Sequence, residues 1–407
     1  MGLSTKKRLL IISQVYIPDP AAVGQYLNDV ATEMVKRGWQ VSVFTADRGY
    51  DNPSLKFLKE EVIDGVKVKR FPLSSFGKSS LAIRLVAAVI FMLQSFLCGV
   101  FTGGLNSILV STSPPMCSLV AVAIAFVKRI PVKYWVMDLN PDQAVELGVV
   151  SGKSLSVNLF NRINRLILRH ADHIIALDQF MANRLNQKLD VSYKMSVIPP
   201  WPLVEYREEI CYDQNPFRQK HDLAGKFVFM YSGNYTFTNP VTTIIEAALL
   251  LKDCRNIIFM FIGGGRNKYE VDDVVKKYNP VNIVSLPYQP FADIKYSLAA
   301  ADTHIVSIGE KLSGIVHPSK IYGAMAAGRP ILFLGPVDSF IGCLLKDHNI
   351  GWQVDHGNIE EALNTITNIT DTPMQELEMM GSRARQLAVN EYSRNALLNQ
   401  FCAIIDR

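Results

Sequence analysis

The chain lacks the residue patterns that mark disulfide-rich, zinc-binding and metal-clamped proteins. Its six cysteines are scattered, with no Cys-x-x-Cys pair and no cluster of Cys and His. Neither a disulfide framework nor a structural zinc site is therefore expected, which fits a reducing compartment such as the cytoplasm. No Asp-x-Asp sequence occurs in the 407 residues, so a metal clamp of that type is not expected. Any bound anion has to be met by Lys, Arg or helix ends.

Charge is also absent from one long stretch. Residues 85–127 contain no charged residue and no histidine. The first half of this stretch is about long enough to span a bilayer, but Gln94, Ser95 and three glycines interrupt it. We therefore expect buried or interfacial helices here rather than a membrane span.

The net charge of +5 is unevenly distributed along the chain. Residues 1–200 hold 23 Lys and Arg against 14 Asp and Glu, whereas the remainder holds 19 against 23. A basic first half predicts contact with an anionic surface, and the uncharged stretch favours a membrane. No compact mixture of basic and aromatic residues occurs, so nucleic acid is not an expected partner.

Apolar segments alternate with helical patterns from one end of the chain to the other. Residues 9–13 and 41–45 are expected strands, and the 3.6-residue spacing of 23–37, ended by Gly38, predicts a helix. A second series of the same kind begins at residue 226, after the proline-rich linker 199–202. This alternation predicts α/β architecture with two doubly wound, parallel-sheet domains, whose ligands bind at the carboxyl ends of the strands.

Candidate site residues lie where these strands are expected to end. Gly233 and Asn234 follow the first strand of the second series, and "GGG" at residues 263–265 follows the next. A turn of this kind allows a ligand to approach the backbone closely, although a simple strand-to-helix turn explains Gly233 and Asn234 equally well. Asp138, at the end of "YWVMD", is the best carboxylate candidate, whereas Asp142 is expected to cap a helix.

The segment "HPSKIYGAMAAG" (residues 317–328) places a lysine at the expected start of a helix. A cation is mildly unfavourable at a helix N-terminus unless an anion shares the site. Ser319 is expected to cap this helix. Lys320, together with free backbone amides, then forms an anion site beside His317. The alternative is an ordinary surface lysine.

Taken in order along the chain, the motifs resemble the GT-B retaining glycosyltransferases of family 4, closest to the subgroup that builds bacterial exopolysaccharide, O-antigen and capsule. The resemblance covers nearly the whole chain and rests on "GQYLNDVATEMVKRGWQVSVFTA", "MDLNPDQAVELG", "RHADHIIALDQFMANRL", "FMYSGNYTFTNPVTTIIEAA", "FMFIGGG" and "PSKIYGAMAAGRPIL".

The resemblance implies GT-B fold, with two Rossmann-like domains facing a central cleft. Residues 1–199 would bind the acceptor, residues 203–388 the nucleotide sugar, and residues 389–407 would form a helix packed back on the first domain. The implied reaction moves a hexose or N-acetylhexosamine, with a UDP-sugar favoured as donor and no metal required. The implied acceptor is polyprenyl-diphosphate-linked or a saccharide. The protein would lie at the inner face of the plasma membrane.

The same resemblance assigns roles to individual residues. Lys320 and Asp138 match catalytic positions in the cleft, and Gly24 matches a first-domain loop facing the donor. The full set of expected donor-binding residues is Gly24, Gly233, Asn234, Gly264, Arg266, Tyr288, Glu310, His317, Ser319 and Lys320.

Two positions depart from the family pattern. Many members carry two glutamates where this chain has Ile315 and Gly323, and place Arg and Lys in the loop after "YSGN". Glu310 and Arg266 are candidate substitutes. The departures leave two alternatives open: a nucleotide-sugar epimerase of the same architecture, and a catalytically inactive member that acts as an assembly partner.

Overall fold

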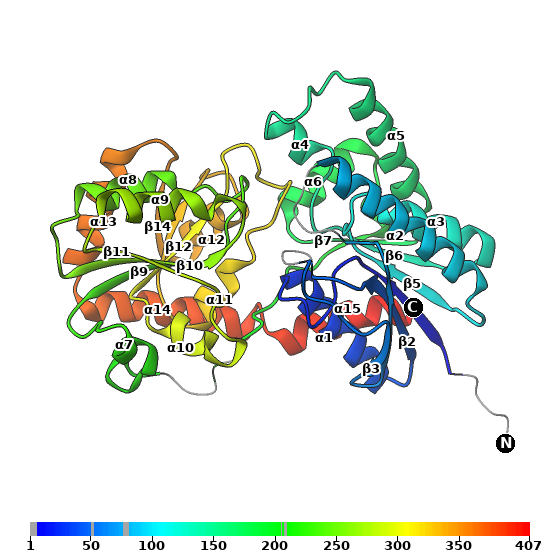
Figure 1. Ribbon diagram of the computed structural model, residues 1–407, viewed down its shortest axis with the longest axis horizontal. Coiled ribbons are helices and arrows are strands. Elements are labelled where there is room, and N and C mark those ends of the chain that lie inside the picture. Colours follow the sequence, from blue (N-terminus) through cyan, green and yellow to red (C-terminus); the bar gives the residue numbers. More distant parts are fainter. Residues whose placement is uncertain (1–5, 50–52, 76–80, 205, 207–209) are drawn as a thin grey trace. The chain divides into compact units, whose positions relative to one another are not determined.

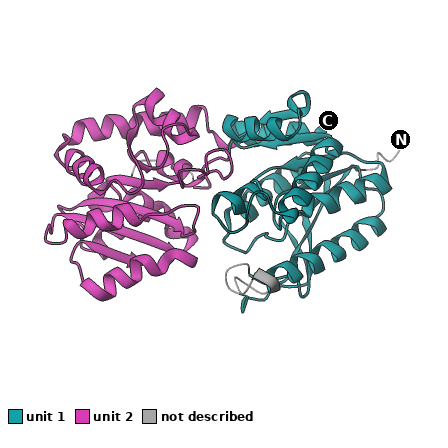
Figure 2. Ribbon diagram, turned by 90° about the horizontal axis from the view of Figure 1, so that it is seen from above, with its two compact units in different colours: residues 1–199, 395–407 teal, residues 200–394 magenta. Residues whose placement is uncertain are grey.

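The computed structural model describes most of the chain, and these residues form two compact units (Figure 2). The described residues are 6–49, 53–75, 81–204, 206 and 210–407. The first unit comprises residues 1–199 and 395–407, and the second comprises residues 200–394. Each unit is an α/β domain built on one sheet, as the alternating sequence pattern predicts.

The first unit contains an eight-stranded sheet in the order β3-β4-β2-β1-β5-β6-β7-β8. All neighbouring strands are parallel except the edge pair β3 and β4. In the central strand β1, residues 9–12 are completely buried, which explains their uninterrupted apolar sequence. The strands are β1 (Arg8–Ile12), β2 (Gln40–Ala46), β3 (Glu60–Ile63), β4 (Val66–Phe71), β5 (Ser107–Val110), β6 (Val132–Trp135), β7 (His173–Ala176) and β8 (Met195–Val197).

Helices cover both faces of this sheet. In Figure 1, α2, α3 and α5 lie on one face, and α1 lies with α15 on the other. The helices are α1 (Ala22–Lys36), α2 (Leu81–Phe101), α3 (Cys117–Lys128), α4 (Asp142–Glu146), α5 (Leu155–His170), α6 (Gln179–Lys188) and α15 (Arg394–Asp406).

The last helix belongs to the first unit, although its sequence follows the second. Phe401 packs against Trp135 of β6, with ring centroids 4.5 Å apart. Asp406 accepts hydrogen bonds from the Trp39 indole (2.8 Å) and the Arg37 guanidinium (2.9 Å). The expected return of the C-terminal helix to the first domain is therefore seen.

The second unit contains a fully parallel, six-stranded sheet in the order β11-β10-β9-β12-β13-β14. The order reverses direction between β9 and β12, and ligands of such sheets bind at that point, outside the carboxyl ends of the strands. The strands are β9 (Phe227–Asn234), β10 (Ile257–Gly264), β11 (Ile283–Leu286), β12 (Thr303–Ser307), β13 (Ile331–Leu334) and β14 (Gly351–Val354).

Apolar side chains fill both faces of the second sheet. Phe229 and Phe259 stack across β9 and β10, with ring centroids 5.1 Å apart, at the centre of the larger core. The covering helices are α7 (Pro216–Lys220), α8 (Thr242–Leu250), α9 (Tyr269–Tyr278), α10 (Ile294–Ala299), α11 (Lys320–Ala326), α12 (Phe340–His348), α13 (Ile359–Asp371) and α14 (Met374–Asn390).

Candidate active site

Glycines form the carboxyl end of the β9–β10 pair, and we call Gly233, Gly263, Gly264 and Gly265 the glycine edge. Three of them have φ between 125° and 141°, a region that side chains rarely tolerate. A Cβ on Gly263 would lie 1.9 Å from the carbonyl oxygen of Gly233. A Cβ on Gly265 would lie 2.2 Å from Oδ1 of Asn234. The sequence keeps glycine here because the two strand ends approach each other too closely for any side chain.

Lys320 extends from the start of α11 onto the glycine edge. Its Cε lies 2.6 Å from where a Cβ on Gly233 would be, so a larger residue there would displace the lysine. Its Nζ lies 5.1 Å from the centre of the Tyr231 ring. In the part of the chain that the structure describes, no carboxylate lies within ion-pair distance of this ammonium group. Burial lowers the pKa of Lys320 to about 8, as expected of a cation that has lost water and gained no anion.

Two further expected donor residues, Tyr288 and Arg266, also lie at the glycine edge. The ring of exposed Tyr288 covers Gly264, and its hydroxyl donates to the Gly264 carbonyl oxygen (3.2 Å). Arg266 follows the edge directly and holds its guanidinium 5.7 Å from the centre of the Phe237 ring. Phe237 belongs to the loop after "YSGN", which has no Arg or Lys of its own. Arg266 therefore places a positive charge beside this loop.

The start of α11 differs from the expectation. Ser319 is already helical, with φ −60° and ψ −13°, and its side chain caps no amide. The amides of Ile321 and Tyr322 donate to the carbonyl oxygens of Pro318 (3.2 Å) and Ser319 (3.3 Å). The predicted serine cap and free first-turn amides are therefore wrong, because the chain enters the helix through a tight turn. An anion at this place would therefore meet the side chain of Lys320 rather than the amides of Ile321 and Tyr322.

The remaining expected residues of the second unit play different parts. His317 is half-buried, with Nε2 2.7 Å from the hydroxyl of Tyr322 and its ring against Phe340. Glu310 is exposed, and no ion pair to it occurs among the described residues. Ile315 is completely buried, in keeping with the absence of a carboxylate from that position.

In the first unit, Asp138 lies three residues beyond the end of β6. Its backbone amide donates to Oγ1 of Thr112 (3.3 Å), and burial raises the pKa of its carboxyl group to about 6. Asp142 does not cap the next helix as expected. It is the first residue of α4 and accepts a hydrogen bond from the Lys188 ammonium (2.6 Å). Among the described residues the carboxylate of Asp138 has no ion pair, unlike that of Asp142, so Asp138 is the better candidate for proton transfer.

Gly24 does not lie in a loop. It is buried in the first turn of α1, where a Cβ would come within 3.0 Å of the Cα of Tyr16. Its amide donates to the carbonyl oxygen of Ala21 (3.0 Å). The structure therefore gives Gly24 a packing role: it lets α1 start against the segment after β1.

The second unit contains another buried lysine, Lys268, which the sequence analysis did not single out. The ammonium of buried Lys268 donates to the Phe261 carbonyl oxygen (2.6 Å) and lies 4.7 Å from the centre of the Tyr235 ring. Burial lowers its pKa to about 8. The sequence places Lys268 only at the start of an amphipathic helix, which is typical of a surface lysine, so no pattern distinguishes it.

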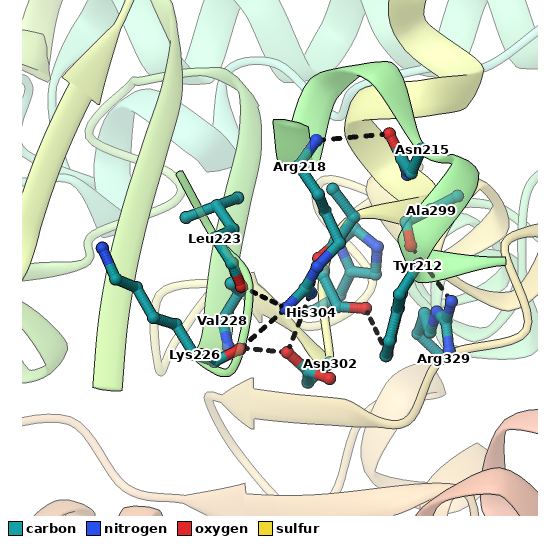
Figure 3. A network of polar contacts seen from close by, with 12 residues as sticks. Tyr212, Asn215, Arg218, Leu223, Lys226, Val228, Ala299, Asp302, His304 and Arg329 are labelled. Atoms are coloured by element: carbon teal, nitrogen blue, oxygen red, sulfur yellow. Dashed lines mark hydrogen bonds and ion pairs between the residues drawn. The ribbon is translucent and has the colours of Figure 1, made fainter. Parts of the chain in front are cut away.

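The opposite, amino edge of the same sheet carries a fully bonded cation (Figure 3). Buried Arg218 pairs with Asp302 (3.3 Å), which also accepts the amide of Val228 (2.8 Å). The other Arg218 hydrogen bonds go to the carbonyl oxygens of Leu223, Lys226 and Ala300, at 2.6–2.8 Å. This network ties the segment after the linker to the sheet.

Comparison with known proteins places this geometry in a class. The model of the glycosyl transferase 4-like domain matches residues 21–201. Over 98% of both chains, the protein is similar to the sucrose-phosphate synthase of Thermosynechococcus elongatus, with a TM-score of 0.76 and 15% identity. Anabaena HepE, solved with UDP-glucose, matches with a TM-score of 0.70 and 15% identity, over 98% of this chain and 99% of that one. The fold is therefore GT-B.

Two further proteins similar to this chain are glycosyltransferases or probable glycosyltransferases. WaaG, a glycosyltransferase involved in lipopolysaccharide biosynthesis, matches with a TM-score of 0.69 and 15% identity, over 98% of this chain and 99% of that one. The probable glycosyltransferase WbjE of Pseudomonas aeruginosa is 26% identical over 277 residues, covering 67% of this chain and 68% of the relative. Residues 21–201 thus match the glycosyl transferase 4-like domain, and the whole chain has the GT-B fold, as its motifs indicate.

Proposed function

We propose that the protein transfers a hexose or N-acetylhexosamine from a nucleotide diphosphate sugar to a polyprenyl-diphosphate-linked or saccharide acceptor in cell-surface polysaccharide synthesis. A UDP-sugar is the favoured donor, retention of configuration the favoured outcome, and no metal is required. The proposed location is the cytoplasmic face of the membrane. WbjE supports glycosyl transfer, WaaG supports the cell-surface polysaccharide context, and HepE supports the donor class.

The observation that carries the proposal is the unneutralised Lys320 ammonium on the glycine edge. Glycine leaves the backbone of both strand ends uncovered at Gly233 and Gly263, so a diphosphate can approach Lys320 closely. Charge develops on the diphosphate as the sugar departs, and a preorganised cation stabilises that charge more than the ground state. Asp138 of the first unit is the candidate for handling the acceptor proton.

A panel of UDP-, GDP- and dTDP-sugars tests the donor, with binding measured by calorimetry. We expect UDP-sugars to bind and Lys320→Ala to weaken that binding. Product analysis then separates the alternatives: transfer needs an acceptor, whereas epimerisation proceeds from the donor alone. An inactive assembly partner would give neither product.

Two further measurements test the details. Proton NMR of the first-formed product should show the anomeric configuration of the donor, and an inverted product would contradict the retaining mechanism. Turnover should persist in EDTA at an excess over all divalent ions. Loss of turnover that is restored by Mg²⁺ or Mn²⁺ would contradict metal independence.

A further inference from the structure

Helix α2 is apolar on two opposite faces, although only one of them is buried. Along its inner side, every fourth residue packs into the first unit, from Ala87 to Gly99. Phe91 is completely buried against Phe71 of β4, with ring centroids 6.0 Å apart. Gly99 lets α3 approach so closely that a Cβ there would lie 2.5 Å from Cδ1 of Ile124. This inner side is part of a core, so α2 is held in the fold along its length.

The outer side of α2 carries a second apolar row at the same spacing. We call this row the outer stripe, and its side chains are between 49% and 84% exposed. A helix on the surface of a globular domain normally presents polar residues here. The outer stripe consists of Leu85, Val89, Leu93, Leu97 and Phe101.

The neighbouring helices continue this surface with positive charge and without negative charge. Helices α2, α3 and α5 pack in a row on one face of the sheet and together contain no Asp or Glu. Phe126 and Val127 at the end of α3 are exposed as well. The cations that these three helices carry are Arg84, Lys128, Arg162, Arg165 and Arg169.

Two of these arginines line a groove between α5 and α6. From α5, Arg162 and Arg165 line it with Asn158, Asn161 and the exposed Leu155 and Leu159, and α6 contributes Gln187 and Lys188. Among the described residues neither arginine has an ion-pair partner. Unpaired guanidinium groups and amide groups beside exposed leucines suit a ligand that is anionic at one end and apolar at the other.

We propose that α2, α3 and α5 form a docking surface for an anionic lipid bilayer. The outer stripe enters the boundary between headgroups and acyl chains, and the arginines of α5 contact lipid phosphates. This inference deepens the membrane location proposed above, but it does not depend on transferase activity because lipid binding is measured without donor or acceptor.

The same observations argue against two other uses of α2. A membrane-spanning helix would have to leave the core, exposing Phe91 and separating Gly99 from Ile124. A dimer formed through this face would bring the same five cations of two copies together, with no acidic group on these helices to offset them. A bilayer with anionic headgroups satisfies both the apolar stripe and the positive charge.

Flotation with vesicles tests the proposal on the full-length protein. We expect the protein to float with vesicles of 30% phosphatidylglycerol and 70% phosphatidylcholine at low salt, and less at 0.5 M NaCl. The triple variant Val89→Gln, Leu93→Gln, Leu97→Gln should lower the partition coefficient more than tenfold, because three exposed apolar side chains are lost. The matched control changes three exposed apolar residues of the second unit, Leu250→Gln, Met379→Gln and Val389→Gln, and should bind as the wild type does.

A second variant pair tests the charge. Arg162→Gln with Arg165→Gln should weaken binding about fivefold for each arginine removed and reduce the salt dependence. Lys276→Gln with Lys277→Gln, on exposed positions of α9, serves as the control and should bind normally. Circular dichroism melting and calorimetric binding of the donor establish that each variant is folded and that its donor site is intact.

Three outcomes would overturn the proposal. The first is recovery of the wild type in the soluble fraction at low salt, and the second is equal binding to pure phosphatidylcholine vesicles. The third is a dimer, detected by light scattering, that the triple variant converts to a monomer, which would assign the outer stripe to a second copy of the chain. A protein that floats as expected yet turns over no donor would refute the transferase proposal and leave this one standing.

Discussion

The second unit holds two cations at opposite edges of one sheet, and they are treated in opposite ways. At the amino edge, Arg218 is enclosed by three carbonyl oxygens and the carboxylate of Asp302. At the carboxyl edge, the side chain of Lys320 packs against Gly233, and no described residue neutralises its charge. A protein that stabilises one cation so completely is able to do the same for the other. The difference supports the proposal that Lys320 binds an anion of the donor.

Removing the paired cation should have the largest effect. Arg218→Met leaves the buried Asp302 carboxylate without its partner, and breaking a buried pair in this way costs about 3–5 kcal/mol. Urea unfolding should show this loss. Arg255→Met, at an exposed arginine before β10, is the control and should unfold like the wild type. A normally stable Arg218→Met protein would mean that the network in Figure 3 contributes little.

Removing the unpaired cation should affect function and spare the fold. Lys320→Ala loses a charge-assisted contact worth about 1.5–3 kcal/mol, or roughly ten- to a hundredfold in donor affinity. The free energy of unfolding should stay the same or increase, because a desolvated charge is removed. Calorimetry with the donor and urea unfolding measure the two quantities. The neighbouring exposed Lys311→Ala is the control, and unaltered donor affinity in Lys320→Ala would identify Lys320 as an ordinary surface lysine.

The same contrast should appear as a pH dependence. The ammonium of free Lys320 loses its proton near pH 8, so donor affinity should be constant below pH 8 and fall above it. The fall cannot exceed the effect of Lys320→Ala. Stability should change in the opposite direction: between pH 8 and about 10.5 the unfolded chain binds more protons at this site, so its contribution to folding stability increases with pH.

Calorimetry and urea unfolding across pH 7–10 check both trends. Lys320→Met should remove the steps that belong to this lysine. A donor-affinity step that persists in Lys320→Met would assign the titration to another group, of which Lys268 is the first candidate because its pKa is also lowered to about 8.

The smallest effect is expected at the rim of the glycine edge. Arg266 is exposed, and an exposed ion pair of the kind its guanidinium would form with a diphosphate is worth up to about 1 kcal/mol. Arg266→Ala should therefore lower donor affinity roughly two- to fivefold. Phe237→Leu keeps the arginine but removes the ring, so it shows whether Phe237 positions Arg266. If Arg266→Ala matched the loss in Lys320→Ala, the two cations would be equal partners in binding the diphosphate.

The sequence predicted the architecture well, because parallel strands that are buried on both faces have continuous apolar sequences. Residues 9–12 and 257–262 are of this kind, and the prolines after Ile198 coincide with the end of the first unit. The antiparallel edge strand β3 was not predicted, because "EEVI" is half exposed and carries two charges. An edge strand of this type has no hydrophobic signal of its own.

The candidate site was predicted only in part, and the reason is geometric. Glycine spacing identified the turns after β9 and β10, but only the structure shows that a Cβ on Gly263 would clash with Gly233. Ser319 satisfies the residue preference of a helix cap, yet the turn through Pro318 makes it helical. Gly24 matched a loop by resemblance and lies in a helix. Sequence patterns identify residues with the right local preferences. The direction of each side chain depends on contacts between segments that are far apart in the sequence.

The return of α15 has a consequence for dividing the protein. Residues 1–199 produced alone would lack Phe401 and Asp406, so Trp135 would lose its cover and Trp39 its hydrogen bond. The two ends of the chain lie side by side, since the ammonium of Lys7 donates to the carbonyl oxygen of Asp406 (3.3 Å). A circular permutant that begins at Asn395, continues through a short linker into residue 6 and stops at Pro199 would carry the whole first unit on one continuous chain. Such a permutant would allow lipid binding to be measured in the absence of the second unit.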